Sequence, residues 1–483
     1  MIELSCEKIL EACNLEYICG DKARMCKGCT IDSRQVTQDS IFVAFKGERV
    51  DGNAYVENAI ASGAALCIMS ERPQADLIAK AELEGCVLAY IQDEDGEECM
   101  LALAGAWRDA NPQWKVVGIT GSVGKTTTKQ ICAAAASAQV KTCATKGNFN
   151  NLIGMPLTLM QASRDDEVVI LEMGMNHAGE LTRLTCCARP DVAIITNIGT
   201  SHIGNLGGRD NICRAKAEIL KGMTPSSVKT SSGVTSKLVV FAQDSYAQVL
   251  ENEYAKPLGI QVVKAGITDI DDAYLSDLAL DDKVCPGFIM HYEDGQAYPV
   301  QLSIPGKASA YDCVLALCAL DALGLDKNLA CKGAGQVENT GMRMEILGDA
   351  NTPCIINDTY NASTPSMAQA LDVLACWDSQ GKRIAVLGEM GEMGQEAPGM
   401  HRLVGAYAAG KGLDMLCVIG HELADCMAEG ARLVGMSEDK IEVFRDVPEA
   451  LTILKPIFTK DDVILVKASR SCELEKFSKG VLL

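Results

Sequence analysis

The sequence of 483 residues lacks any run of 18 apolar residues, so a membrane-spanning helix is not expected. We expect no signal peptide, because the opening Met1-Ile-Glu-Leu-Ser-Cys-Glu-Lys8 is already amphipathic and charged. Basic residues are few relative to acidic ones: 44 Lys and Arg stand against 64 Asp and Glu, and the formal net charge is −20. This balance argues against nonspecific nucleic-acid binding. We therefore expect a cytoplasmic protein with no membrane span and no nucleic-acid partner.

Two ligand patterns are missing as well. Cys26-Lys-Gly-Cys29 is a single Cys-x-x-Cys, and no second ligand pair lies at a spacing that zinc sites use. No Gly-x-Gly-x-x-Gly opens the last third of the chain, so a dinucleotide is not indicated there. Many of the 22 cysteines lie in Ala-rich helical patterns, where they replace Ala or Val as small hydrophobes. We expect them to be reduced thiols in a cytosol.

The length and an apolar content of 48% predict about three domains with buried cores. Short apolar strands alternate with helical segments, which is typical of α/β domains with largely parallel sheets. We predict a small α/β domain at 1–105, a central P-loop parallel-sheet domain at 106–338 and a Rossmann-like domain at 339–483. The predicted strands lie at 40–46, 64–69, 116–119, 168–172, 192–197, 238–241, 355–358, 383–388, 415–420 and 462–467.

A glycine-rich loop follows the strand at 116–119 and leads into a helix that starts at Lys125. Such a loop cradles phosphates, because its backbone N–H groups and the helix N-terminus present partial positive charge. We expect Lys125 to reach the β- and γ-phosphates and Thr126 to place its hydroxyl on Mg²⁺. The full Walker pattern would put a glycine at Ile119, so an ordinary glycine-rich turn is the alternative. The predicted nucleotide-binding residues of the loop are Gly121, Ser122, Gly124, Lys125, Thr126 and Thr127.

Further polar side chains follow other predicted strands. Glu172 and Asn197 end two of them, and ligands of parallel sheets bind at the carboxyl ends of strands, so Glu172 is a candidate Mg²⁺ ligand. Three roles are open for His202 in the next loop: ligand, base or polar surface. In the first domain, Asp32-Ser-Arg34 and Lys46 place hydroxyl and cationic donors on loops. These donors suit a phosphorylated or nucleotide ligand, with solvated loop surface as the alternative.

Together these stretches resemble the ATP-dependent Mur ligase family, and the resemblance covers nearly the whole chain. The matching stretches are Asp32-Ser-Arg34, Phe42-Val-Ala-Phe-Lys-Gly47, Gly121-Ser-Val-Gly-Lys-Thr-Thr127, Gly147-Asn-Phe-Asn-Asn-Leu-Ile-Gly-Met-Pro-Leu-Thr158, Leu171-Glu-Met-Gly-Met-Asn176, Thr196-Asn-Ile-Gly199, Ala215-Lys-Ala-Glu218, Gly341-Met-Arg343, Asn357-Asp-Thr-Tyr-Asn-Ala362, Val386-Leu-Gly-Glu-Met-Gly-Glu-Met-Gly394 and Lys467-Ala-Ser-Arg470. The runs at 358–362 and 387–394 point to the branch that adds D-Ala-D-Ala to UDP-MurNAc-tripeptide.

The resemblance implies a two-metal ATP site that closes between domains. Thr126 and Glu172 match ligands of the Mg²⁺ between the β- and γ-phosphates, and His202 matches a ligand of a second Mg²⁺. Lys216, which would otherwise be a solvated helix lysine, matches a lysine that carries a CO₂-derived carbamate and so becomes a Mg²⁺ ligand. The residues that match ATP contacts from the third domain are Arg343 and Asp358, and Asn197 belongs to the same nucleotide set. The predicted catalytic residues are Lys125, Lys216, His202 and Arg343.

The resemblance also implies where substrates bind and how they react. The residues assigned to the UDP-sugar-peptide and the dipeptide are Ser33, Arg34, Lys46, Asn150, Asn151, Asn361, Lys467, Ser469 and Arg470. A substrate carboxylate attacks the γ-phosphate of ATP to give an acyl phosphate, and the amine of D-Ala-D-Ala then forms the amide. His401 is a candidate for the base, with a surface or orienting role as the alternative. A monomer is expected.

The sequence departs from the family pattern at positions that usually help to hold adenine and ribose. Gly306-Lys-Ala-Ser309 and Asp312 stand where the family has Gly-x-His-Asn and a further Asn, and Gln243 lies in another altered stretch. Residues 224–237 form a Ser/Thr-rich stretch in place of a short turn. The alternatives are therefore a sibling ligase with another amino acid or acceptor, a non-catalytic nucleotide-binding paralogue, or an NTP-driven motor.

Overall fold

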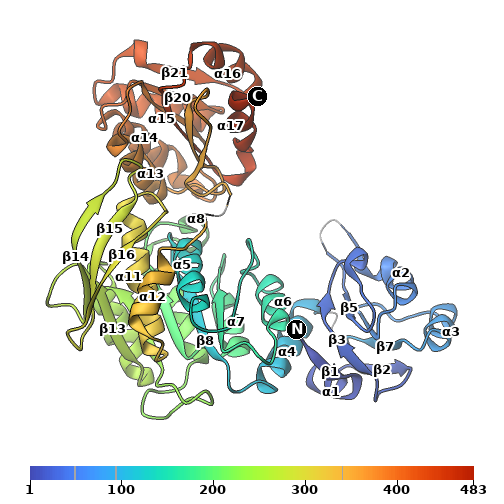
Figure 1. Ribbon diagram of the computed structural model, residues 1–483. Coiled ribbons are helices and arrows are strands. Elements are labelled where there is room, and N and C mark those ends of the chain that lie inside the picture. Colours follow the sequence, from blue (N-terminus) through green and yellow to red (C-terminus); the bar gives the residue numbers. More distant parts are fainter. Residues whose placement is uncertain (48–49, 93–94, 340) are drawn as a thin grey trace.

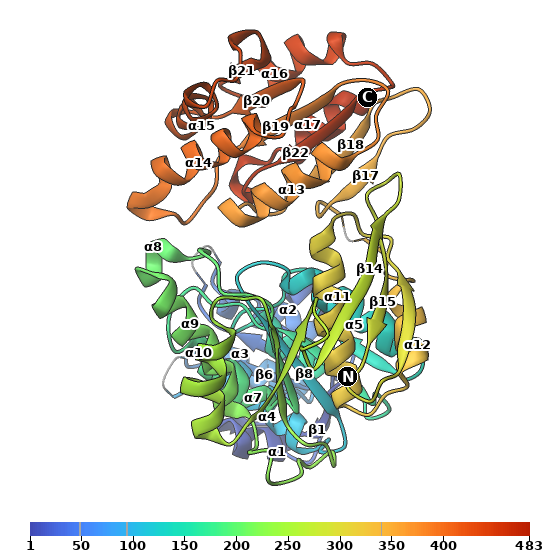
Figure 2. The same ribbon diagram turned by 90° about the vertical axis from the view of Figure 1, so that its left-hand side faces the viewer.

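The computed structural model describes residues 1–47, 50–92, 95–339 and 341–483. Three α/β domains follow one another along the chain, and each is built around its own sheet (Figure 1). The N-terminal domain lies to one side of the central domain, and the C-terminal domain lies above the central domain in both views (Figures 1 and 2). None of the described helices is long and apolar enough to cross a membrane.

The N-terminal domain holds a five-stranded sheet in the order β2-β7-β6-β5-β4, parallel except for β2, and a separate antiparallel pair of β1 and β3. Its strands are β1 (Glu3–Ser5), β2 (Glu16–Cys19), β3 (Met25–Lys27), β4 (Cys29–Thr30), β5 (Ile41–Ala44), β6 (Leu66–Met69) and β7 (Val87–Tyr90). Its helices are α1 (Cys6–Ala12), α2 (Val56–Ala61), α3 (Ala75–Leu83) and α4 (Gly96–Asp109).

The central domain holds a nine-stranded sheet in the order β16-β15-β14-β13-β12-β11-β8-β10-β9. Its strands are β8 (Lys115–Thr120), β9 (Thr142–Ala144), β10 (Val168–Glu172), β11 (Val192–Ile195), β12 (Lys237–Phe241), β13 (Gln261–Gly266), β14 (Ala273–Leu280), β15 (Pro286–His291) and β16 (Ala297–Gln301). Its helices are α5 (Lys125–Ser137), α6 (Gly154–Gln161), α7 (Glu180–Ala188), α8 (Ile203–Leu206), α9 (Arg209–Ala217), α10 (Ala247–Val249), α11 (Lys307–Ala322) and α12 (Lys327–Ala334). The seven strands from β14 to β9 in this order, β8 included, pair in parallel, whereas β14, β15 and β16 form an antiparallel meander.

The C-terminal domain holds a six-stranded sheet in the order β17-β18-β22-β19-β20-β21, in which β17 alone is antiparallel to its neighbour. Its strands are β17 (Glu345–Leu347), β18 (Cys354–Asp358), β19 (Arg383–Gly388), β20 (Met415–Ile419), β21 (Ile441–Phe444) and β22 (Val463–Lys467). Its helices are α13 (Thr364–Cys376), α14 (Ala397–Ala409), α15 (Glu422–Leu433), α16 (Val447–Leu454) and α17 (Glu475–Leu482).

Strand β8 occupies the place in the central sheet where the strand order reverses. Its apolar side chains Val116, Val117 and Ile119 are fully buried, as expected for a parallel strand covered on both faces. It pairs with β10 on one side and β11 on the other, so that Glu172 lies opposite Ile119 at the carboxyl edge of the sheet. Such a switch point opens a crevice at the strand ends, which places the glycine loop after β8 in a binding position.

The N-terminal and central domains share one continuous apolar core. Helix α4 runs across the predicted boundary at 105 and packs on α6 and α7 of the central domain. The edge-to-face pair of Trp107 and Trp114 lies in this core, and both side chains are fully buried. The two domains are therefore joined by packing as well as by the chain.

Candidate active site

A cavity of about 650 Å³ lies where the central and C-terminal domains face one another. The central domain lines it with the glycine loop and the start of α5, and the C-terminal domain lines it with Arg343, Asp358 and Lys467. A second part of the lining is apolar and includes Ile304 and Val373. Residues predicted to hold ATP from two domains thus share one cavity with an apolar wall that suits a nucleobase.

At two positions of the glycine loop, the backbone conformation and the close neighbours allow only glycine. Gly121 has a φ of +149°, and a Cβ there would lie 1.9 Å from Oγ1 of Thr196. Gly124 has a φ of +86° and precedes α5, and a Cβ there would lie 2.4 Å from Oδ1 of Asp312. The tight loop directs the N-terminus of α5 at the cavity, where its free N–H groups favour an anion.

Glu172 is a buried carboxylate at the end of β10 with one oxygen unused by hydrogen bonds. Its Oε1 accepts hydrogen bonds from Oγ1 of Thr126 at 3.2 Å and from Nδ2 of Asn150 at 2.9 Å. Its Oε2 is buried without a hydrogen-bond partner and lies 3.4 Å from Nζ of Lys129. Burial opposes ionisation, but Lys129, Lys125 and Arg343 outweigh it and hold the pKa of Glu172 below its usual value. An ionised carboxylate with a free oxygen beside a threonine hydroxyl fits a Mg²⁺ site.

Lys216 and Lys125 meet at one backbone carbonyl. Nζ of Lys125 donates to the carbonyl oxygen of Gly121 at 2.8 Å, and Nζ of Lys216 donates to the same oxygen at 2.9 Å. Burial, with a further contribution from the charge of Lys125, lowers the pKa of Lys216 well below its usual value. A neutral amine is the nucleophilic form of lysine, so Lys216 is chemically suited to react with CO₂.

The loop after β11 is tied to the glycine loop. The hydroxyl of Ser201 donates to the carbonyl of Ser122 at 3.0 Å, and the N–H of Gly199 donates to the hydroxyl of Ser122 at 2.8 Å. The next residue, His202, lines the cavity, and its Nδ1 lies 2.7 Å from Oε2 of Glu392 in the C-terminal domain. His202 thus stands beside the phosphate-binding loop and in contact with the other domain.

The C-terminal domain presents a cation and a carboxylate to the cavity. The guanidinium of Arg343 lies 4.0 Å from the ring centroid of Tyr360, which holds it flat against the ring. Nζ of Lys467 donates to the carboxylate of Asp358 and to the carbonyl of Asn361, the latter at 2.8 Å. Lys467 is buried, so this pairing neutralises its charge and fixes Asp358 at the end of β18.

Three parts of the chain are similar to the domains of one protein family. Residues 119–320 match the Mur ligase middle domain, 342–470 match the Mur ligase, glutamate ligase domain, and 26–108 match the Mur ligase family, catalytic domain. A UDP-N-acetylmuramoyl-tripeptide--D-alanyl-D-alanine ligase of Bacillus subtilis is 32% identical over 455 residues, covering 94% of this chain and 93% of the relative. The chain belongs to the Mur ligase family.

A second relative and a solved structure are also similar to this Mur ligase over most of its length. A relative of the same name from Mycobacterium bovis is 31% identical over 478 residues, covering 92% of this chain and 89% of the relative. A crystal structure of MurF from Acinetobacter baumannii superposes with a TM-score of 0.86 at 27% identity, covering 100% of this chain and 99% of that one. The predicted family, the three-domain α/β fold class and an ATP-dependent ligase activity are confirmed.

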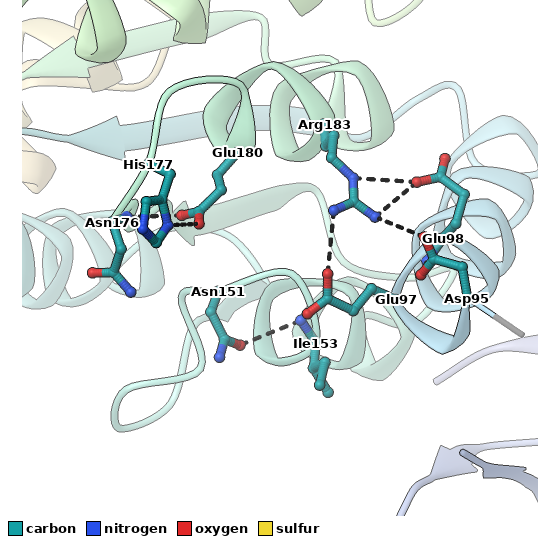
Figure 3. A network of polar contacts seen from close by, with 9 residues as sticks. All are labelled: Asp95, Glu97, Glu98, Asn151, Ile153, Asn176, His177, Glu180 and Arg183. Carbon is teal, nitrogen blue, oxygen red and sulfur yellow. Dashed lines mark hydrogen bonds and ion pairs between the residues drawn. The ribbon is translucent and has the colours of Figure 1, made fainter. Parts of the chain in front are cut away.

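The predicted substrate residues of the central domain line the cavity of the Mur ligase. Asn150 and Asn151 lie next to one another on its wall. Oδ1 of Asn151 accepts from the N–H groups of Ile153 and Gly154, at 3.3 and 2.8 Å, and so caps the start of α6 (Figure 3). Asn150 therefore donates a hydrogen bond to Glu172, whereas Asn151 accepts hydrogen bonds from the backbone at the start of α6.

Near this wall, one cation joins α7 to the start of α4. Arg183 contacts Glu98 at 2.9 Å, Glu97 at 3.2 Å and Asp95 at 3.7 Å (Figure 3). The cluster connects the helix that follows the catalytic strand β10 with the helix that ends the N-terminal domain. It adds a polar link to the shared apolar core between these two domains.

The predicted substrate residues of the N-terminal domain lie apart from the cavity. The guanidinium of Arg34 is 87% exposed and forms an ion pair at 2.8 Å with Asp32, which also accepts from the N–H of Arg34 at 3.0 Å. Ser33 begins the short 3₁₀ helix η1 (Ser33–Gln35), and Lys46 follows β5 in the same domain. These described residues are not among those that line the cavity, so the structure does not bring them to the glycine loop.

Several predicted roles differ from what the contacts allow. His401, a candidate base, is fully buried: its Nε2 accepts from the N–H of Met390 at 2.9 Å, and its Nδ1 lies 2.7 Å from the carbonyl of Ala397. Both nitrogens are thus in contact with the backbone, and burial lowers the pKa of His401, an arrangement that favours the orienting alternative over the base. Asn197, expected at the nucleotide, exchanges hydrogen bonds of 3.1 and 2.9 Å with the backbone of Val123 and supports the loop.

The residues predicted for the dipeptide are engaged within the C-terminal domain. Lys467 faces the cavity, but its ammonium is paired with Asp358, as described above. Ser469 is buried, and its N–H donates to the carbonyl of Glu389 at 3.0 Å. Arg470 is exposed and forms an ion pair of 2.6 Å with Glu475. Neither of these last two described residues lines the cavity.

Sequence reasoning missed three residues of the site. Lys129 is four residues after Lys125 and therefore one turn further along the same face of α5, a spacing that could have identified it. Tyr360 lies inside a family run but received no role. Glu392 approaches His202 only through the packing of two domains, and no local pattern signals such a contact.

Proposed function

We propose that this Mur ligase joins D-alanyl-D-alanine to UDP-N-acetylmuramoyl-tripeptide, with hydrolysis of ATP to ADP and phosphate. The relatives that carry this activity in their names support the assignment along almost the full chain. The observation that carries it is the glycine loop itself: buried Lys216 bonds to its Gly121 carbonyl, and buried Glu172 and Arg343 of another domain line the cavity beside it. The peptidoglycan precursor would thus be extended by an amide bond.

The first step brings two anions together, because the tripeptide carboxylate must approach the γ-phosphate. A carboxylate oxygen attacks phosphorus and the bond to ADP breaks, which gives an acyl phosphate. Lys125 and Arg343 supply positive charge on opposite sides of the cavity, and the N-terminus of α5 adds N–H donors. Their positions are fixed before reaction by Gly121 and Tyr360 respectively.

In the second step, the amine of D-alanyl-D-alanine attacks the acyl carbon and phosphate leaves. Water would compete as a nucleophile, so a cavity between two domains protects the acyl phosphate. Lys467 holds Asp358 and Asn361 at this side of the cavity. We assign Lys467 and Asn361 to the dipeptide subsite, in which Lys467 acts through its partners, and Asp358 to the ATP site that adjoins it.

Two Mg²⁺ ions complete the proposal. Thr126 and Glu172 would hold the first, and His202 and a carbamate on Lys216 would contribute to the second. Bound Mg²⁺ supplies charge neutralisation at the phosphates. The carbamate would form when the neutral amine of Lys216 adds to the carbon of CO₂ and its proton passes to solvent, leaving an anionic oxygen ligand.

The remaining assignments concern the first domain and the state of the protein. We propose that Ser33, Arg34 and Lys46 contact the UDP moiety, with 1–105, 106–338 and 339–483 as the three domains. The cysteines, which are all free thiols in the structure, are consistent with a reducing cytoplasm. A monomer is proposed as the working unit.

The decisive experiment measures phosphate release with ATP, Mg²⁺, bicarbonate and UDP-MurNAc-tripeptide, with and without D-alanyl-D-alanine. We expect release only when the dipeptide is present, together with a product that mass spectrometry identifies as the pentapeptide. Release with a single amino acid instead of the dipeptide would favour a sibling ligase. No release with any amine, in protein that still binds ADP, would favour a non-catalytic paralogue.

A further inference from the structure

A contact between the central and C-terminal domains lies at the mouth of the active-site cavity. His202 immediately precedes α8, and Glu392 lies two residues before the short 3₁₀ helix η6 (Gly394–Glu396). Nδ1 of His202 is buried without a hydrogen-bond partner and lies 2.7 Å from Oε2 of Glu392, and the histidine side chain is only 17% exposed. In Figure 2, α8 lies at the upper edge of the central domain, below α14 of the C-terminal domain.

The backbones beneath this pair approach closely. A Cβ at Gly204 would lie 2.9 Å from the carbonyl oxygen of Glu392 and 2.9 Å from the nitrogen of Gly394. Any larger residue at 204 would therefore push the two loops apart. His202 and Glu392 both have a φ of +62°, an uncommon conformation for residues with a Cβ, which persists only where the surroundings fix it. The contact is thus sterically specific.

The loop that carries Glu392 is held by the core of its own domain. The imidazole of His401 bridges the N–H of Met390 and the carbonyl of Ala397, one at each end of the loop. The side chains of Met390 and Met393 are buried in the domain core. Glu392 therefore moves with the C-terminal domain as a rigid part of it.

On the central side, the contact continues to the phosphate-binding loop. His202 follows Ser201, whose hydroxyl donates to the carbonyl of Ser122. The N–H of Gly199 donates to the hydroxyl of Ser122. A chain of direct contacts thus runs from Glu392 through His202 to the glycine loop, and such a chain can transmit a change of position.

We propose that Glu392 is a positioning residue. When the C-terminal domain closes, the close packing at Gly204 brings the Glu392 carboxylate to His202. This contact orients the imidazole of His202 toward the phosphate-binding loop. The inference rests on the proposed function, because it assigns His202 to the ATP site. It adds that closure of the C-terminal domain is coupled to the reaction at the phosphates of ATP. The contact strengthens nucleotide binding only by the factor by which nucleotide favours closure, whereas turnover requires the contact itself.

Two variants separate the charge from the close approach. Glu392→Gln removes the charge and keeps the shape, and Gly204→Ala introduces the Cβ that the loop cannot accommodate. Gly399→Ala in α14 is the matched control, because a Cβ there meets nothing within 4 Å. Glu392→Asp retains the charge on a shorter side chain and should recover part of the activity lost in Glu392→Gln.

Hydrogen–deuterium exchange with ADP and Mg²⁺ reads closure directly, without any peptide substrate. We expect ADP to protect residues 199–206 and 389–396 in the wild-type protein and in Gly399→Ala, but not in Glu392→Gln or Gly204→Ala. The kcat for phosphate release should fall roughly 10- to 100-fold in both test variants. Because ADP binding and closure are linked, the Kd for ADP should rise by the factor by which ADP favours closure, and this rise should be smaller than the loss in kcat. A role in folding alone would lower the melting temperature and leave kcat unchanged.

The exchange and kinetic results decide the inference separately from the proposed function. Wild-type protection by ADP that is lost in the variants supports the coupling even if D-alanyl-D-alanine proves to be the wrong amine. Wild-type kcat and wild-type protection in Glu392→Gln and Gly204→Ala would overturn the coupling even if the ligation assay succeeds. Because the Glu392 side chain is 56% exposed, Glu392→Gln is expected to fold and alone suffices for the test.

Discussion

Nζ of Lys129 lies 3.4 Å from Oε2 of Glu172, and the two side chains are 5% and 2% exposed. The ammonium of Lys129 faces Oε2 of Glu172, the carboxylate oxygen that lacks a hydrogen bond. The hydroxyl of Thr126 donates to the other oxygen, Oε1. A buried ion pair is stable only while both partners remain, because an isolated buried charge is strongly disfavoured. Lys129 therefore keeps Glu172 ionised and ready for Mg²⁺.

Replacement of Lys129 by methionine should destabilise the protein by about 3 kcal/mol, because it leaves Glu172 as an uncompensated buried charge. Urea unfolding monitored by circular dichroism would measure the loss. Lys141→Met is the matched control: Lys141 and Asp165 are also 3.4 Å apart but are 56% and 82% exposed, and such a pair contributes about 1 kcal/mol or less. The double variant Lys129→Met with Glu172→Gln should recover much of the loss. Equal losses in Lys129→Met and Lys141→Met would contradict the assignment.

Lys216→Ala should abolish most turnover and retain the fold. The variant lacks the amine that would carry the carbamate, so we expect phosphate release to fall by roughly 100-fold or more, with an unchanged circular dichroism spectrum. Short carboxylic acids should restore part of the rate, because their oxygens can take the place of the carbamate. The exposed Lys221 provides the control, and Lys221→Ala should behave as wild type. Wild-type rates in Lys216→Ala would remove this residue from the metal site.

The sequence was sufficient to predict the part of the site that is built from local patterns. The strand at 116–119, the glycine loop and the helix from Lys125 follow from an apolar run, two glycines and a helical pattern within about twenty residues. The placement of Glu172 beside the loop followed from the rule that ligands bind at the carboxyl ends of parallel strands. These inferences need no knowledge of distant packing.

What could not be predicted depends on long-range packing or on solvent exposure. The meander of β14, β15 and β16 was not predicted, because its half-exposed strands lack the continuous apolar runs by which the buried parallel strands were found. The turn between β14 and β15 reaches the C-terminal domain in Figure 1, and its Val284 is buried in the apolar core cluster of that domain. His401 carried the chemistry of a base, and only its burial between two backbone groups reveals a supporting role.

The ring of Tyr360 should contribute to ATP binding through Arg343. Removal of the ring in Tyr360→Leu frees the guanidinium, and we expect the KM for ATP to rise roughly 2- to 30-fold, the range of a desolvated cation–π contact. Tyr360→Phe retains the ring and should remain close to wild type. Steady-state phosphate release at varied ATP would measure both. If Tyr360→Phe proves as impaired as Tyr360→Leu, the hydroxyl rather than the ring is responsible.

Asp312 should make stability depend on pH in a direction opposite to that of a salt-bridged carboxylate. It is 9% exposed beside the glycine loop, and burial raises its pKa well above the ordinary value of 3.8. The folded protein therefore holds this proton to a higher pH than the unfolded chain does. The associated stability is complete below pH 3.8 and is lost as the pH rises through the raised pKa, at about 1.4 kcal/mol for each pH unit.

Asp312→Asn keeps the shape of the side chain and has no proton to lose, so its stability should not fall across this window. We expect the melting temperature of the variant to exceed that of the wild type at neutral pH, and the difference to shrink as the pH is lowered toward 4. Melting curves between pH 4 and 8 at constant ionic strength would measure it. Asp269→Asn, at an exposed position, should follow the wild-type profile in parallel. A difference between Asp312→Asn and wild type that stays constant with pH would show that the buried carboxyl is ionised throughout, and the glycine loop would then carry a permanent negative charge at Gly124.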